Sequence, residues 1–304
     1  MFMAAAFLAV VAAAAPSPSA QDRRNIALST AIVRHVGDRL WPDWSKTPFA
    51  IDLLTARGPV AINFPKPLAA PSFPRQLEAT FPLTNGVPTI VIGEPQFTAA
   101  KTPTRWSVTL LHEHFHQWQD SWPQYQAAVD RLGLAPKGGG NGMWMLNYGF
   151  PYKDKRVDRI YDTMAGRLAT AVGAAGTSSF KTAVASYLSA RAAFRAALRP
   201  NDYRYFAFQC WQEGTARYTE IAIAHIAAEA DPRFVTAADA RSLAQDSAAT
   251  RTRVLTQLRS QSLDTDQRVN FYALGAGEAL LLDQLNPAWH QHYLDRRMDL
   301  GNFF

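Results

Sequence analysis

The sequence predicts an α+β fold that is predominantly α-helical, with a small, mainly antiparallel sheet near the start and a large helical C-terminal part. The segments that combine β-forming residues with flanking turn residues lie in the first third of the chain. After a glycine-rich loop at residues 137–142, apolar residues recur almost throughout at helical spacing. Hydrophobic residues make up 48% of the 304 residues and charged residues only 18%, which indicates a folded chain with a sizeable core.

The first 20 residues predict a signal peptide that does not belong to the fold. Residues 1–15 are wholly apolar and too few to cross a bilayer comfortably, and small residues follow them at 16–20. No lysine or arginine precedes the apolar run, so an uncleaved anchor is the alternative. We expect a secreted or periplasmic protein whose mature chain begins between Pro16 and Arg23 and has no membrane span.

A helix and a hairpin are expected at the start of the mature chain. Residues 22–40 place their apolar side chains on one helical face. Residues 49–54 and 59–64 predict two strands joined by a glycine-containing turn. A proline-rich connector follows at 65–74, and the run at 88–92 predicts a further strand.

The next predicted helix begins at Thr102 and Pro103, because threonine is a good N-cap and proline suits the first helical position. A second, shorter helix is expected near residues 124–132. We expect residues 21–304 to form a single domain, either compact or in two lobes at about 21–133 and 150–304.

The helix that starts at Pro103 contains the sequence H-E-x-x-H, formed by His112, Glu113 and His116. At about 100° per residue, the two histidines lie about 40° apart on one face and can share a metal ion. Glu113 lies near the same face, where its carboxylate can take a proton from a metal-bound water. A chance match on an ordinary helix is the alternative, and a third ligand would discriminate between the two.

The neighbouring face of this helix carries the apolar stripe Val108, Leu111, Phe115 and Trp118, which predicts a helix packed on a core. His114 points roughly opposite to the ligand pair. We therefore interpret His114 as a packing residue or as a residue that supports a ligand, and not as a ligand itself.

The best source of a third ligand is a downstream helical segment in which Glu213, Arg217 and Glu220 share one face. Gly214 costs helix stability, but beside a ligand it would allow another helix to approach closely. A surface ladder of Glu–Arg–Glu ion pairs is the alternative interpretation. The nearby Cys210 is the only cysteine, so no disulfide can form within the chain. It is expected to be a small buried thiol rather than a ligand.

H-E-x-x-H followed far downstream by the E-G-x-A-x-Y-x-E segment at residues 213–220 resembles the gluzincin group of metallopeptidases, especially its peptidase-MA-like branch. The resemblance implies a zincin-like domain with one zinc ion per chain. It implies that His112, His116 and Glu213 are the zinc ligands and that Glu113 is the general base. Glu220 remains the alternative third ligand.

Hydrolysis also needs a donor for the oxyanion that develops in the transition state. Tyr272, which opens the segment Y-x-x-G-x-G, is the preferred candidate, and a core tyrosine is its alternative interpretation. Arg217, Tyr218 and His290 are further candidates. Tyr218 is expected to point away from Glu213, and His290 is expected on a surface helix.

The segment 137–152 combines glycines with aromatic residues and predicts either a substrate-facing lid or an aromatic plug beneath a long loop. The net charge is +6, but the basic residues are scattered and usually have an acidic neighbour, so nucleic-acid binding is not expected. The function expected from the sequence is a zinc-dependent hydrolase that cleaves a peptide or protein substrate. The alternatives are a zinc hydrolase of a non-peptide substrate and an inactive zincin-like binding or scaffold protein.

Overall fold

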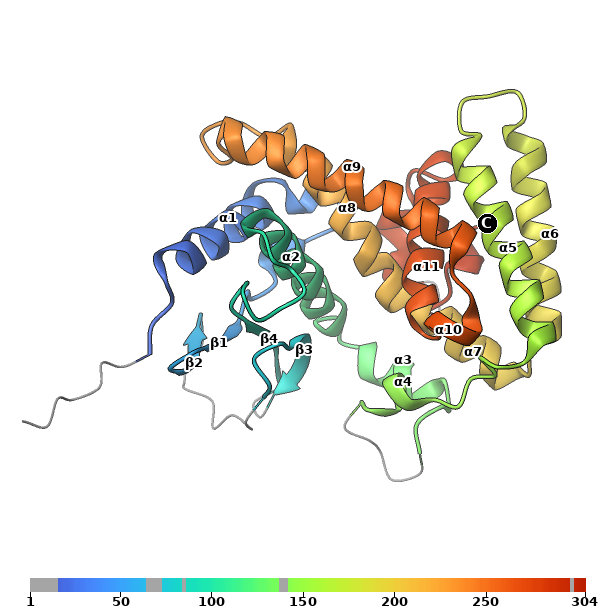
Figure 1. Ribbon diagram of the computed structural model, residues 1–304, viewed down its shortest axis with the longest axis horizontal. Coiled ribbons are helices and arrows are strands. Elements are labelled where there is room, and N and C mark those ends of the chain that lie inside the picture. The colour runs from blue at the N-terminus through green and yellow to red at the C-terminus, as the bar shows by residue number, and fades with distance from the viewer. Residues whose placement is uncertain (1–15, 64–72, 84–85, 137–141, 296–297) are drawn as a thin grey trace, which may run out of the picture.

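The computed structural model describes residues 16–63, 73–83, 86–136, 142–295 and 298–304. Helices dominate these residues and a four-stranded sheet lies in the first third, so the expected α+β, predominantly α-helical fold is confirmed (Figure 1). The N-terminal elements are α1 (Ala20–Val36), η1 (Gly37–Arg39), η2 (Trp44–Lys46), β1 (Ile51–Thr55), β2 (Gly58–Ile62), β3 (Glu78–Leu83), β4 (Val87–Gly93) and α2 (Pro103–Asp120).

The remaining elements are all helical. They are α3 (Tyr125–Arg131), α4 (Trp144–Asn147), α5 (Lys155–Gly173), α6 (Phe180–Ala197), α7 (Pro200–Gln209), η3 (Cys210–Gly214), α8 (Thr215–Ala228), α9 (Ala237–Ser260), α10 (Leu263–Asp266), α11 (Val269–Leu285), η4 (Trp289–Asp295) and η5 (Leu300–Phe303). The sheet, α1 and α2 lie at one end of the molecule and α5 to α7 at the other, with α8 and α9 running between them (Figure 1).

Helix α1 begins with a capping box, in which the Ser19 hydroxyl accepts from the Asp22 amide and the Asp22 carboxylate accepts from the Ser19 amide. Its expected apolar face is buried, with Ile32 at its centre. The α-helix ends at Val36, four residues earlier than expected, because the chain tightens there into the 3₁₀ turn η1.

The sheet has the strand order β2-β1-β4-β3. The expected hairpin is confirmed as the antiparallel pair β1 and β2. The sheet is mainly antiparallel, as expected, because β1 with β2 and β3 with β4 are antiparallel pairs, but the central pair β1 and β4 is parallel. Strand β3 is not predicted from the sequence, since Pro82 interrupts its β-forming residues. Its position at the edge of the sheet explains why proline is tolerated there.

One face of the sheet packs on α2. Side chains from β1 and β4, including Leu53 and Ile92, form a compact apolar cluster with Trp106 and Leu110 of α2. The larger core lies on the other side of α2 and extends through the helical part of the molecule. Helix α2 is therefore buried between the sheet and the helices, which is why its whole central segment is inaccessible.

Helix α2 has the start that the sequence predicts. The Thr102 side chain accepts from the Arg105 amide, and Pro103 occupies the first turn. The predicted apolar stripe is buried, with Leu111 and Phe115 fully inaccessible. Helix, cap and stripe are all local features, and the sequence predicts them correctly.

Helix α11 lies unusually close to the segment that carries Glu213. A Cβ atom added to Gly214 would lie 2.4 Å from the Cα atom of Gly275 in α11. Any side chain at either position would therefore push the two backbones apart. This confirms that Gly214 permits a close approach between helices.

Part of the connector at 65–74 and part of the loop at 137–152 lie outside the described residues. Within the described part of the loop, Phe150 is buried against Phe271 and Trp144 stacks on Phe208, as expected of an aromatic plug. Met143 and Leu146, in contrast, are exposed. Among the described residues, no helix combines the length and the apolar character that a membrane span requires.

Candidate metal centre

His112 and His116 lie one turn apart on α2 and present the same ring nitrogen to each other. Their Nε2 atoms are 3.2 Å apart. Both side chains are largely buried, with exposed fractions of 8% and 12%. The face that the sequence predicts for the ligand pair is therefore present, and it points to the interior.

The third member of the cluster, Glu213, comes from η3, a π-helical turn between α7 and α8. Its Oε2 atom lies 3.4 Å from Nε2 of His116 and 3.8 Å from Nε2 of His112. Together the three residues form the one group of potential metal-binding side chains found among the described residues. A π turn widens the helix by one residue, and such turns often occur at functional sites.

The tautomer of His112 follows from its other ring nitrogen. Nδ1 lies 2.7 Å from Oε1 of Glu220, and an ionised carboxylate can only accept a hydrogen bond. Nδ1 of His112 therefore carries the proton, and Nε2 offers its lone pair to the cluster. A carboxylate that orients a histidine in this way is the usual support of a metal-binding imidazole.

The tautomer of His116 is fixed in the same manner, but by a neutral partner. Its Nδ1 atom lies 2.7 Å from Oε1 of Gln119. The Tyr293 hydroxyl donates to the backbone oxygen of Trp211, so it accepts from Nε2 of Gln119. The amide of Gln119 must then turn its oxygen to His116, whose Nδ1 donates and whose Nε2 lone pair also faces the cluster.

One zinc ion can bind between the two Nε2 atoms and the carboxylate oxygen when both imidazoles are unprotonated at Nε2. In a tetrahedral site with metal–nitrogen bonds of about 2.0–2.1 Å, the ligand atoms are separated by about 3.3 Å. The observed separations of 3.2, 3.4 and 3.8 Å are close to this value. The donor set and its geometry therefore fit one zinc ion with a fourth, open position.

Glu113 lies beside this triangle without belonging to it. Its Oε1 atom is 4.0 Å from Nε2 of His112, and its other oxygen accepts from the Thr80 hydroxyl at 2.9 Å. Thr80 belongs to the edge strand β3, which packs on α2. Burial raises the pKa of Glu113, the direction expected of a proton acceptor that works near neutral pH.

The buried charges of the metal-free cluster shift one another strongly. Burial disfavours a charged His112, but hydrogen bonds to Glu213 and Glu220 outweigh it and raise its pKa to about 9. Burial also opposes ionisation of Glu220, yet the charges of Arg105 and Arg217 hold its pKa far below the usual range. Glu220 is thus a permanent anion that holds His112 in place.

Glu220 does not reach the triangle. It accepts from His112, from Arg105 of α2 and, at 2.9 Å, from Arg217. The pair of Arg217 and Glu220 forms half of the surface ladder considered as the alternative, but Glu220 is only 2% exposed, so this part is buried.

Tyr272, the preferred oxyanion donor, reaches the cluster from α11. Its ring lies parallel to that of His112 with the centroids 6.4 Å apart. Burial and the neighbouring Glu213 carboxylate raise the pKa of Tyr272 well above its usual value, so its hydroxyl stays protonated. Arg268, the residue that precedes α11, donates to this hydroxyl at 3.0 Å.

The other candidate donors lie elsewhere. Tyr218 points away from the cluster, as expected, and donates to Asp283 at 3.0 Å. The expectation that His290 lies on a surface helix is wrong, because its side chain is only 16% exposed and contacts the Trp41 ring. The short 3₁₀ turn η4 folds His290 back onto the core.

Two more residues near the motif have structural roles. His114 is fully buried, bonds Gln117 through Nδ1 at 2.7 Å and packs on Phe49, in agreement with its interpretation as a packing residue. Cys210 is also fully buried and is no member of the cluster, and burial raises the pKa of its thiol well above the usual value.

Three residues that shape the site are not expected from any sequence motif. Thr80 lies on a strand that was not predicted, and Arg268 lies outside every motif. Gln119 does carry a signal, since helical spacing places it on the same side of α2 as His112 and His116.

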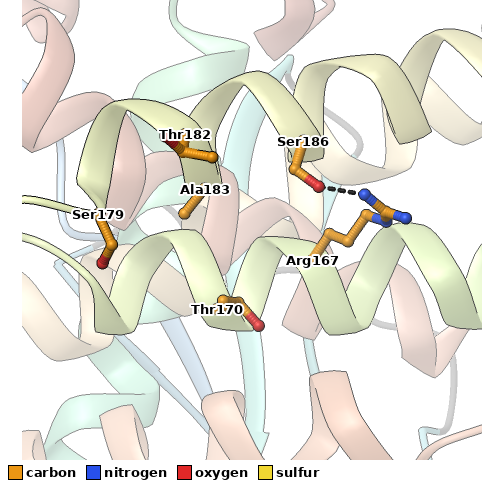
Figure 2. A pocket seen from close by; sticks show the side chains of 6 residues that line it. All are labelled: Arg167, Thr170, Ser179, Thr182, Ala183 and Ser186. Atoms are coloured by element: carbon orange, nitrogen blue, oxygen red, sulfur yellow. Dashed lines mark hydrogen bonds between the residues drawn. The ribbon is translucent and has the colours of Figure 1, made fainter.

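One hollow in the described part of the surface lies away from the cluster. It has a volume of about 340 Å³ and lies between α5 and α6, where Arg167 donates to Ser186 (Figure 2). Its lining consists of short polar side chains and one arginine, and none of the metal-cluster residues takes part.

In comparisons with known proteins, no family model, no curated protein and no solved structure matches the chain.

Proposed function

We propose that the protein is a zinc-dependent hydrolase and that its substrate is a peptide or protein. The observation that carries this proposal is the convergence of two Nε2 lone pairs and one carboxylate oxygen beside a buried, separate carboxylate. His112, His116 and Glu213 would hold the zinc ion. When bound, zinc would polarise the scissile carbonyl and lower the pKa of a water molecule.

Glu113 would accept the proton of the attacking water and then pass it to the leaving nitrogen. Its buried position beside the ligands suits this role, and the hydrogen bond from Thr80 holds one of its oxygens in place. Because Glu113 is not a member of the ligand triangle, a metal can bind without it. The general base and the metal ligands are therefore separate groups that mutagenesis can distinguish.

Tyr272 would donate a hydrogen bond to the oxyanion of the tetrahedral intermediate. Its raised pKa keeps the donor protonated, and its position on α11 places it against His112. Together with the motif resemblance to gluzincins, these roles make hydrolysis of an amide bond the chemistry that the residues support best.

The direct test is the replacement Glu113→Gln in protein with a measured zinc content. Loss of a general acid–base group costs about 10²–10⁴-fold in rate, so we expect at least that loss against a mixed peptide library. Zinc should remain near one ion per chain, as in the unchanged protein. Full activity of Glu113→Gln on a substrate whose cleavage chelators block would exclude Glu113 as the base.

The same experiment separates the alternatives. Zinc binding without release of peptide fragments would favour a non-peptide substrate. Absence of stoichiometric zinc would favour a binding or scaffold protein and contradict the proposal.

We further propose that the protein is exported. This proposal depends on residues 1–15, which lie outside the described residues, and on the small residues that follow them. The capping box of α1 needs Ser19, so cleavage before Ser19 would preserve it. N-terminal sequencing of protein from its natural source tests this, and an intact Met1 on cytoplasmic protein would contradict export.

A further inference from the structure

Three arginines lie around the metal cluster, and two of them pair with Glu220, the carboxylate behind His112. Arg105 pairs with Glu220 and Asp246, and Arg217 pairs with Glu220. These two guanidinium groups stabilise the buried carboxylates behind His112.

Arg268 instead lies beside Glu213. Only its Nη1 atom makes hydrogen bonds among the described residues, to the Tyr272 hydroxyl at 3.0 Å and, with long separations of 3.4 and 3.5 Å, to Gln209 and Glu213. Within the same part of the chain, Nε and Nη2 have no hydrogen-bond partner. Arg268 therefore keeps the donors with which a guanidinium binds a carboxylate through two parallel hydrogen bonds.

Arg268 also lies on the open side of the cluster. The exposed fraction of the side chains rises from 8% at His112 through 16% at Glu213 to 24% at Arg268. The guanidinium group of Arg268 is therefore accessible to a solute from solvent. A partly buried arginine binds an anion more strongly than a fully solvated one, because less water competes for it.

The spacing between Arg268 and the cluster suits the end of a peptide chain. One oxygen of Glu213 faces His116 at 3.4 Å, and the other lies 3.5 Å from Arg268, so a single carboxylate group separates the guanidinium from the ligand triangle. In a peptide, the terminal carboxylate lies one residue beyond the last peptide carbonyl, and successive Cα atoms are about 3.8 Å apart. The separation of Arg268 from the ligand triangle and the separation of the terminal carboxylate from the last peptide carbonyl are therefore of the same order.

We propose that Arg268 binds the C-terminal carboxylate of the substrate, so that the enzyme removes the last residue of a peptide chain. This inference rests on the proposed zinc-dependent hydrolysis and specifies its substrate class. One water adds to the last peptide bond: its oxygen joins the carbonyl carbon, the C–N bond breaks, and a proton passes to the leaving amine. The products are a free amino acid and a peptide shortened by one residue.

The test uses one library of N-acetylated hexapeptides, synthesised both with a free C-terminal carboxylate and as C-terminal amides. Zinc-loaded protein is incubated with each form, and mass spectrometry identifies the products. Charge-assisted hydrogen bonds to an arginine correspond to roughly 10–100-fold in affinity. We expect the free acids to be cleaved at least about tenfold faster, with release of single C-terminal residues.

A second measurement does not depend on turnover. Zinc-loaded Glu113→Gln protein is mixed with each library form, and the retained peptides are quantified after ultrafiltration. We expect retention of the acids over the amides, and Arg268→Gln in the same background should remove this preference. Arg268→Lys, which keeps the charge but not the paired donors, should retain part of it. Arg259→Gln, at an exposed arginine of α9, is the matched control and should change nothing.

Each outcome separates the inference from the function on which it rests. Equal retention of acids and amides by zinc-loaded protein, or cleavage within both libraries at internal bonds, would overturn the role of Arg268 and leave the hydrolase in place. If Arg268→Gln lost zinc but still preferred the acids over the amides, Arg268 would only hold Glu213 in place. That result would also overturn its role in binding the C-terminal carboxylate. Absence of zinc in the unchanged protein would instead contradict the proposed function.

Discussion

His112 and His114 lie two residues apart on α2, yet they have opposite electrostatic environments. His112 faces the carboxylates of Glu213 and Glu220, and its pKa in the metal-free protein is raised to about 9. His114 is buried beside Phe49, and burial lowers its pKa to about 4. The same residue type therefore offers a charged or metal-binding group on one face and a neutral packing group on the other. The difference shows that the partners of a histidine, rather than its burial, determine its chemical role.

The largest expected effect is on metal content. Replacement of both His112 and His116 by alanine removes two of the three converging donors, so we expect complete loss of the one zinc ion per chain. His114→Leu, the matched control on the opposite face, should keep it. Metal analysis of the purified proteins measures both, and stoichiometric zinc in the double variant would refute the ligand assignment.

The second expected effect is on stability at acidic pH. His114 is neutral in the folded protein, while in the unfolded chain it gains a proton below its ordinary pKa of 6.5. The unfolded state therefore binds more protons between about pH 6.5 and 4, and stability falls as the pH falls through this window. The difference between a pKa of 6.5 and one of about 4 corresponds to about 3 kcal/mol at most.

Urea unfolding of the zinc-free protein from pH 7 to pH 4 measures this loss. His114→Leu should remove part of the slope in this pH range, and His290, whose pKa burial also lowers to about 4, should account for another part. An unchanged slope in the variant would show that other groups cause the acid sensitivity. His112 acts in the opposite direction: its raised pKa stabilises the zinc-free protein below pH 6.5, and this contribution is lost as the pH rises through about 9.

The third effect distinguishes the two glutamates that face His112. Glu213→Ala removes a converging donor and should abolish most zinc affinity. Glu220→Ala removes only the group that orients His112 and should cost roughly 10–100-fold in zinc affinity. Competitive zinc titrations with a chelator measure both, and the reverse order would make Glu220 the ligand.

The smallest expected effect concerns Gln119. Its amide oxygen fixes the tautomer of His116, as Glu220 fixes that of His112, but it carries no charge. Gln119→Leu should therefore weaken zinc binding by about tenfold, the low end of the range for such supporting residues. The same titrations test this, with Gln117→Leu on the His114 side as the control that leaves zinc affinity unchanged. If Gln119→Leu lost as much zinc affinity as Glu220→Ala, the charge of the residue that orients the histidine would be unimportant.

Much of the candidate site is predictable because it depends on local sequence. The start of α2 at Thr102, the buried stripe around Leu111 and the shared face of His112 and His116 all follow from the geometry of a single helix. The sequence also predicts the segment with Glu213 and Glu220 as the source of a third ligand, and the resemblance to a known motif selects Glu213.

Other features depend on contacts between distant segments, and no local pattern specifies them. The parallel pairing of β1 and β4 and the edge position of β3 arise from the assembled sheet. The inward position of His290 results from the packing of η4 against Trp41. Arg268 enters the site because Gly214 and Gly275 let α11 approach, an event that involves two residues far apart in the chain.

By itself, the sequence determined the helix that carries His112, Glu113 and His116, because a periodic apolar face and a capped start specify a helix locally. Tertiary structure alone decided which nitrogen each histidine offers, because Glu220 and Gln119 set the tautomers through hydrogen bonds. It also decided that Thr80 contacts Glu113 and that Arg268 faces the cluster with unused donors. Such contacts form only when separate elements pack, and packing depends on the shape and burial of the whole chain rather than on spacing within one segment.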